Sequence, residues 1–103
     1  MDFTVDDIDL AREGLALFVT QATEGPQITQ SSYSWDGSEF QIEGVSWSAR
    51  SENIRRSPHV GLVIRDSPVA GPLVVYGEAT LEEGRDGDGV LIRVRPTCAH
   101  RLS

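Results

Sequence analysis

The sequence predicts a mainly β domain whose strands close into a barrel or a sandwich. Three observations predict it: about six short apolar or alternating segments, turns of only a few residues between most of them, and only two stretches with helical features. The 103 residues suit one compact domain, expected to span 1–103, because the chain shows no repeat, low-complexity tract or linker.

The start of the chain predicts a helix and two strands. Thr4 can cap a helix whose first turn is acidic, and Gly14 is the expected end of that helix. An apolar segment rich in β-formers predicts a buried strand over 15–20, and a hydroxyl-rich segment predicts a second strand over 27–35. We therefore expect an N-terminal helix followed by two neighbouring strands.

Asp36-Gly37 is the clearest turn signal in the chain. It predicts a tight hairpin with a primed turn, in which both central residues have positive φ. The third strand is then expected over 38–45. Its apolar and polar residues alternate, which predicts one buried and one solvent-facing side.

The second half predicts one more helix and three strands. Ser48 is expected to cap a short helix that ends before Pro58. The continuous apolar run 60–64 predicts a strand buried on both faces. The segments 73–81 and 90–95 alternate between apolar and polar residues, as strands with one buried face do.

The charge of the chain limits its partners. The formal net charge is -7 and the pI is near 4.6, so the field of the protein repels phosphodiester backbones and anionic membrane surfaces. We therefore expect no nucleic acid and no membrane as partners. All nine basic residues are arginine, and each is a planar donor suited to phosphate or carboxylate.

The expected setting is the cytoplasm. No segment is apolar and long enough to span a bilayer, and the first ten residues are acidic where a signal peptide would be basic. The single cysteine allows no intrachain disulfide, which agrees with a reducing compartment. The core of so small a chain is limited, so a homodimer that adds buried surface is also expected.

Several residue types that often carry chemistry have no supporting pattern here. His59 and His100 lie far apart and without ligands at metal spacing, so no metal site is expected. The stretch around Asp86 and Asp88 is too short for a calcium loop and is read as a turn. Cys98 is interpreted as a structural thiol. No serine lies in a nucleophile elbow and no glycine-rich phosphate loop is present.

Residues 46–58, SWSARSENIRRSP, are the candidate anion site. Three arginines against one acid give this segment a local charge of 3 − 1 = +2 in an acidic chain. Hydroxyl groups, the Arg50 guanidinium and the backbone N–H groups at a helix start can converge on a phosphate. The residues equally allow a plain surface helix whose arginines are solvated, and composition alone leaves both readings open.

Three stretches, in order along nearly the whole chain, resemble the flavin-binding split barrel of the pyridoxamine 5'-phosphate oxidase-like superfamily, which includes deazaflavin-dependent reductases. The first, 25–37, resembles a strand that follows a Gly/Pro turn and ends in an aromatic and Asp-Gly. The second, 40–60, resembles the family's strand, its phosphate-binding Ser/Thr and Arg/Lys, and then Asn-Leu-x-x-x-Pro-x-Val, where this chain has Asn53 and Ile54. The third, 75–79, resembles the strand Val-x-Gly-x-Ala.

This resemblance implies a six-stranded split β-barrel of Greek-key type that binds a flavin, with FMN as the expected cofactor, at the interface of a homodimer. It assigns the cofactor phosphate to Arg50 and Ser48. The remaining cofactor-binding residues that it implies lie along the ring system on the second and third strands: Thr29, Gln30, Ser31, Ser32, Ile42 and Glu43. The implied activity is that of an oxidoreductase, with no catalytic residue named, because the cofactor supplies the chemistry.

Two alternatives stay open. One is a reductase that uses the deazaflavin coenzyme, whose strongly anionic tail favours a basic groove. The other is a split barrel without cofactor that serves as a binding or assembly module. For the two tryptophans, Trp35 and Trp47, packing in the barrel or in a dimer contact is expected rather than stacking on a flavin.

Overall fold

The structure is a computed structural model, and it describes residues 13–65, 72–84 and 87–101. The helix expected from Thr4 lies outside the described residues. The described elements, in chain order, are β1 (Glu13–Ala22), β2 (Gly25–Trp35), β3 (Phe40–Val45), α1 (Ala49–Arg56), β4 (His59–Ile64), β5 (Leu73–Glu83) and β6 (Gly89–Arg101).

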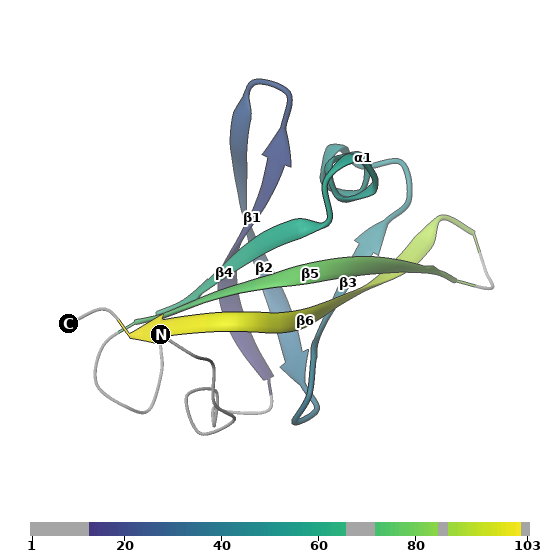
Figure 1. Ribbon diagram of the computed structural model, residues 1–103. Helices are drawn as coiled ribbons and strands as arrows, with labels where there is room; N and C mark the ends of the chain where they lie inside the picture. The colour runs from purple at the N-terminus through teal and green to yellow at the C-terminus, as the bar shows by residue number, and fades with distance from the viewer. Residues whose placement is uncertain (1–12, 66–71, 85–86, 102–103) are drawn as a thin grey trace.

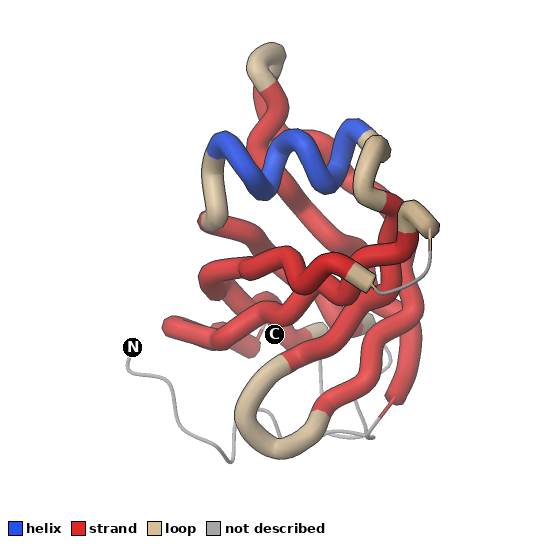
Figure 2. The backbone as a smooth tube through the Cα atoms, turned by 90° about the vertical axis from the view of Figure 1, so that its right-hand side faces the viewer, coloured by secondary structure: helices blue, strands red, loops and turns tan. Residues whose placement is uncertain are grey.

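The six strands form a closed antiparallel barrel in the order β1-β2-β3-β6-β5-β4 (Figure 1). The fold class, six strands in a barrel with a short helix between the third and fourth, is confirmed. The helix α1 lies across one end of the barrel, beside the tip of the β1–β2 hairpin (Figure 2). Among the described residues no helix is long and apolar enough to cross a membrane.

The barrel closes between β2 and β3 at only one end of these strands, and an opening is left along the rest of β2. These strands pair only at Ser34–Gln41 and Trp35–Phe40, whereas β2 pairs with β1 along its whole length. The edge of β2 from Gly25 to Tyr33 has no strand partner on the β3 side in the described part of the chain. This opening, which we call the split, exposes backbone donors and acceptors that another group can use.

Alternation along the strands fills the barrel interior. On β5 and β6 the inward residues are buried while the outward ones, such as Arg93 and Arg95, reach solvent. An aromatic cluster closes the end of the barrel where β2 meets β3: the Phe40 ring lies 5.5 Å from Tyr33 and 4.5 Å from Trp35 between centroids. Trp35 is therefore packed in the barrel as expected, whereas Trp47 is 73% exposed.

Gly14 does not end a helix, and this prediction was wrong. It lies inside β1 and pairs with Tyr33 on β2. A Cβ at this position would come within 3.1 Å of the Tyr33 hydroxyl, so the glycine leaves room for that ring. The cross-strand neighbour, which sequence alone does not reveal, decides the role of this residue.

The predicted hairpin at Asp36-Gly37 forms, but without a two-residue primed turn. Gly37 has a φ of 100° and Asp36 does not have a positive φ, and the loop runs over 36–39. The Asp36 carboxylate accepts the N–H groups of Ser38 at 2.8 Å and Glu39 at 2.9 Å. These side-chain bonds stabilise a wider loop than the tight turn that was expected.

Two strands differ from the expected pattern. On β4 only one face is fully buried, because Val63 and Gly61 on the outer face stay half-exposed in this chain. The strand β6 continues past Pro96 to Arg101. Pro96 pairs with Gly77 next to a register irregularity on β5, where the missing N–H of a proline is tolerated.

Candidate functional site

The N-terminus of α1 is fixed by the serine that the sequence identified. Ser48 has extended backbone angles, and its hydroxyl accepts the N–H of Ser51 at 3.1 Å. Ser51 is fully buried and donates from its own hydroxyl to the Val45 carbonyl at 2.7 Å. The helix start is thus anchored to the end of β3, and the predicted cap is confirmed.

Arg50 extends from α1 into the split. Its Nη1 donates to the Thr29 hydroxyl at 3.3 Å and to the Ser31 hydroxyl, and its Nη2 donates to the Glu43 carbonyl at 3.2 Å. Thr29 and Ser31 belong to β2, whereas Glu43 belongs to β3. One guanidinium therefore connects the two strands where their backbones no longer pair.

The surroundings of Arg50 are those of a half-buried cation. Its guanidinium carbon lies 5.3 Å from the centre of the Phe18 ring, within cation–π range. Burial lowers the pKa of Arg50 from its ordinary value of 12.5, because the charged form loses water. A Cβ at Gly44 would be in ordinary van der Waals contact with Nη2, at 3.5 Å, so the guanidinium packs closely over this part of β3.

Arg50 has no carboxylate partner in the described part of the chain, and neither has Arg56, which donates to the Asn53 amide oxygen instead. Arg55, Arg93 and Arg95 each form ion pairs, whereas Arg50 forms none with any described residue. The Nε and the second hydrogen of Nη2 also have no hydrogen-bond partner within the described ranges. A half-buried cation with unused donors is suited to an anionic ligand.

A cavity of about 480 Å³ lies along the split beside Arg50. We call it the split cavity. Five of its lining residues are among the cofactor-binding residues that the sequence indicated: Gln30, Ser31, Ser32, Glu43 and Arg50. The others are Tyr33, Ser34 and Gln41. The lining is rich in hydroxyl and amide groups from two facing strands, so it can accept a polar planar ligand edge.

The remaining predicted residues lie elsewhere. Thr29 does not line the split cavity, but its hydroxyl accepts a hydrogen bond from Arg50, which does. Ile42 is 1% exposed and faces the core, so its side chain does not reach the cavity. Ser48 lies at the helix start, where its hydroxyl caps the helix and also donates to the Ser51 hydroxyl at 3.1 Å. To contact a cofactor phosphate, the Ser48 hydroxyl would have to exchange its bond to the Ser51 hydroxyl for a bond to a phosphate oxygen.

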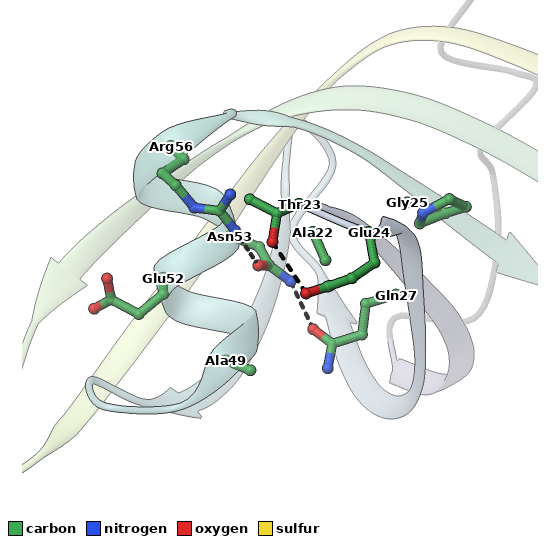
Figure 3. Close-up of a pocket in the computed structure, with 10 residues that line it drawn as sticks. Ala22, Thr23, Glu24, Gly25, Gln27, Ala49, Glu52, Asn53 and Arg56 are labelled. Atoms are coloured by element: carbon green, nitrogen blue, oxygen red, sulfur yellow. Dashed lines mark hydrogen bonds between the residues drawn. The ribbon is translucent and has the colours of Figure 1, made fainter.

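A second cavity, of about 500 Å³, lies between α1 and the tip of the β1–β2 hairpin (Figure 3). We call it the hairpin cavity. Asn53, 3% exposed, donates to Thr20 at 3.0 Å and to Gln27 at 2.6 Å, and it accepts a bond from Arg56 at 2.7 Å. These bonds hold α1 against the hairpin. Two carboxylates also line this cavity, so it favours an anion less than the split cavity does.

The other two arginines of the candidate segment have structural partners. Arg55 donates to the Ser46 carbonyl at 2.9 Å and forms ion pairs with Glu52 and Glu83. Arg56 bonds to Asn53 at the hairpin cavity. The local positive charge of the segment therefore does not converge on one point, and Arg50 alone faces the split. No group of metal-ligating side chains occurs in the described residues.

Sequence reasoning missed three features of the site. Phe18 lies under the guanidinium because it pairs with Thr29, and Gln41 enters the cavity because it pairs with Ser34. Both positions depend on strand register, for which the sequence carries no direct signal. Asn53 had a signal, since it lies in the segment that resembles the family motif, but its role as a buried anchor appears only in the structure.

Comparison with known proteins supports the fold. No protein-family model and no curated protein matches this sequence. Solved structures do match. One is an F420 reductase, which is 20% identical to this chain and superimposes with a TM-score of 0.77. The match covers 90% of this chain and 94% of the F420 reductase chain. A candidate pyridoxamine 5'-phosphate oxidase from Listeria innocua has 22% identity and a TM-score of 0.75, with 85% and 87% covered.

A third structure is a pyridoxamine 5'-phosphate oxidase-related, FMN-binding protein from Nostoc punctiforme, with 10% identity and a TM-score of 0.70 over 89% of this chain and 74% of the other. Matches at this level of identity show a shared fold and do not show a shared activity. Together with the short pairing between β2 and β3, they show that this chain has the split-barrel fold that the sequence resemblance implied.

Proposed function

We propose that this chain binds a flavin nucleotide, FMN, along the split and acts as a small flavin-dependent oxidoreductase. The observation that carries the proposal is Arg50, a half-buried guanidinium with no carboxylate partner among the described residues and with unused N–H donors beside the split cavity. The likeness of the fold to an FMN-binding protein and to an F420 reductase adds support.

In this proposal Arg50 holds the cofactor phosphate, and Ser48 joins it by exchanging its bond to the Ser51 hydroxyl for a phosphate oxygen. The unpaired edge of β2 offers backbone groups to the polar edge of the ring system, beside Gln30 and Ser32. A bound flavin would supply hydride or electron transfer. The chain itself supplies orientation and electrostatics to the bound ring.

The proposal includes a homodimer in the cytoplasm. Large apolar side chains reach solvent on the outside of this chain: Leu15, Ile28, Val45, Trp47 and Tyr76. A second copy can cover part of this surface and close the split cavity from outside, which would remove water from a bound ring. The dimer is therefore part of the proposed site.

Two other candidates each have one supporting observation. The F420 reductase among the matching structures supports a deazaflavin coenzyme in the same cavity. Against it, the hairpin cavity next to the split carries Glu24 and Glu52, which would repel a polyanionic tail. A barrel without cofactor is supported by the bonds that Arg50 already makes to Thr29, Ser31 and Glu43, which partly satisfy its donors within the chain.

Calorimetric titration with FMN and with riboflavin tests the proposal. Since riboflavin lacks the phosphate, the wild-type protein should bind FMN about tenfold or more tightly, as a charge-assisted bond predicts. Arg50→Ala should remove that preference and leave riboflavin binding little changed. Arg56→Ala is the matched control, because it removes an arginine of the same helix that does not line the split cavity.

The outcomes separate the candidates. An absent FMN signal with clear binding of the deazaflavin coenzyme would replace FMN by that coenzyme. No binding of either would leave the barrel without cofactor. Equal preference for FMN in wild type and Arg50→Ala would show that the phosphate is held by other groups and would remove Arg50 from the site.

A further inference from the structure

A thiol and an imidazole lie side by side on the outer face of β6, away from the split. The Cys98 sulfur lies 3.3 Å from Nε2 of His100, a hydrogen-bond distance for a sulfur and a nitrogen. The residue between them, Ala99, is 1% exposed and faces the core, so both side chains point outward. Both are half-buried, which leaves them within reach of a small molecule.

The neighbouring strand fixes the imidazole. Tyr76 on β5 pairs with Cys98, and its ring meets that of His100 edge-to-face at 5.9 Å between centroids and 73° between planes. Val74 pairs with His100 in the same register. A nucleophile beside a base that a third group orients is the general arrangement of an activated thiol.

A groove begins at the same tyrosine. It has a volume of about 340 Å³ and runs over β1, β4, β5 and the Thr97 position of β6, and its mostly apolar lining includes Val19, Val63, Val74 and Tyr76. Tyr76 and Val74 thus contact both the groove and the Cys98–His100 pair. Cys98 and His100 do not line this groove themselves, so the groove adjoins the pair through Tyr76 and Val74.

We propose that Cys98 and His100 form a reactive thiol pair that exchanges with small neutral or cationic disulfides. The net charge of -7 disfavours anionic ones. This reverses the interpretation of Cys98 as a purely structural thiol, and it does not depend on flavin binding. The inference rests on the distance, the orientation by Tyr76 and the adjoining groove.

The exchange balances within the pair. His100 takes the proton of the Cys98 thiol, and the thiolate attacks one sulfur of the small disulfide R–S–S–R. The bond between the two R–S groups breaks as the bond from Cys98 to one sulfur forms. The other sulfur leaves with the electron pair and receives the proton from the His100 imidazolium. The Cys98 sulfur is oxidised to a mixed disulfide, and one R–S group is reduced to R–SH.

The test measures the rate at which the full chain gains one R–S group from bis(2-hydroxyethyl) disulfide, a neutral probe, by intact mass. At about pH 6.5 wild type should react about tenfold faster than His100→Gln, because an ordinary thiol with a pKa of about 8.5 is almost fully protonated there. Cys98→Ser should gain no group.

A second readout needs no variant. The rate for wild type should fall by much less than tenfold per pH unit between about pH 8 and pH 6, where an unassisted thiol loses about tenfold. Among the described residues, the groups near His100 include Tyr76 and Cys98, with Arg101 next in the chain and the Glu78–Arg95 ion pair further along the two strands. A tenfold fall per pH unit, or equal rates for wild type and His100→Gln, would overturn the proposal.

Discussion

Arg50 on α1 donates a hydrogen bond from Nη1 to the Thr29 hydroxyl on β2, over 3.3 Å, and so connects the helix to a strand whose β3 side has lost its backbone partner. The same guanidinium bonds to the Glu43 carbonyl on β3 at 3.2 Å. A side chain thus bridges the part of the barrel wall that backbone pairing leaves open.

Replacing Arg50 by methionine should cost little stability in the absence of ligand. The cation is half-buried without a carboxylate partner, and burial lowers its pKa, so its hydrogen bonds are offset by lost hydration. We expect the free energy of unfolding of Arg50→Met to stay within about 1 kcal/mol of wild type. Urea denaturation of the protein free of flavin measures this. A loss above about 3 kcal/mol would mean that Arg50 is a structural bridge first.

Asn53 should matter far more for stability than its exposed neighbour. Asn53→Ala leaves the buried Thr20 hydroxyl and the Gln27 amide without their donor, at a cost of about 2 kcal/mol. Arg56→Ala removes only a partner at the surface and should cost less than about 1 kcal/mol. Urea denaturation of both variants measures the two losses, and the midpoints can be compared directly if the two transitions have the same slope. Equal losses would contradict the anchoring role of Asn53.

Two glycines on neighbouring strands give a matched pair. A Cβ at Gly77 would lie 2.5 Å from the Arg95 carbonyl oxygen, a backbone atom that cannot move away cheaply, whereas the nearest atom at Gly61 is 3.7 Å away. Gly77→Ala should therefore destabilise the barrel by about 2 kcal/mol or more, and Gly61→Ala should change stability by less than about 0.5 kcal/mol. Thermal unfolding of both variants would reveal the difference, and similar melting temperatures would contradict it.

The loop between β2 and β3 should make stability depend on acid. The N–H groups of Glu39 and Ser38 donate to the Asp36 carboxylate and hold its pKa below the ordinary 3.8. Because the folded pKa is lowered, this stabilisation is present above the unfolded pKa and is lost as the pH falls through the folded one.

The advantage of wild type over Asp36→Asn should therefore be constant between about pH 5 and pH 7 and shrink below about pH 4. Urea denaturation across this range measures it. Ser38→Ala removes the hydroxyl bond to the carboxylate at 3.0 Å but keeps both backbone donors, so it should retain most of the pH dependence of wild type. An advantage that does not change with pH would show that the carboxylate charge plays no part in the loop.

The sequence by itself determined the local features of this protein. Apolar, hydroxyl-rich and alternating segments predicted the six strands, Asp36-Gly37 predicted a hairpin, and Ser48 predicted the helix cap, because each depends on residues close together in the chain. The segment 46–58 and the family resemblance also identified Arg50 as the candidate anion-binding arginine. The expected ends of strands were less accurate: β6 runs beyond Pro96, where pairing with β5 continues across an irregularity.

Only the tertiary structure decided how these elements meet. The early end of β2–β3 pairing creates the split, and the β1–β2 register sets Phe18 beside Thr29 under the guanidinium. The same kind of long-range pairing makes Gly14 a strand residue beside Tyr33 and brings the Tyr76 ring to His100, next to Cys98. Strand register joins residues far apart in the chain, and a shift of one residue would turn every side chain to the other face, so local pattern cannot supply it.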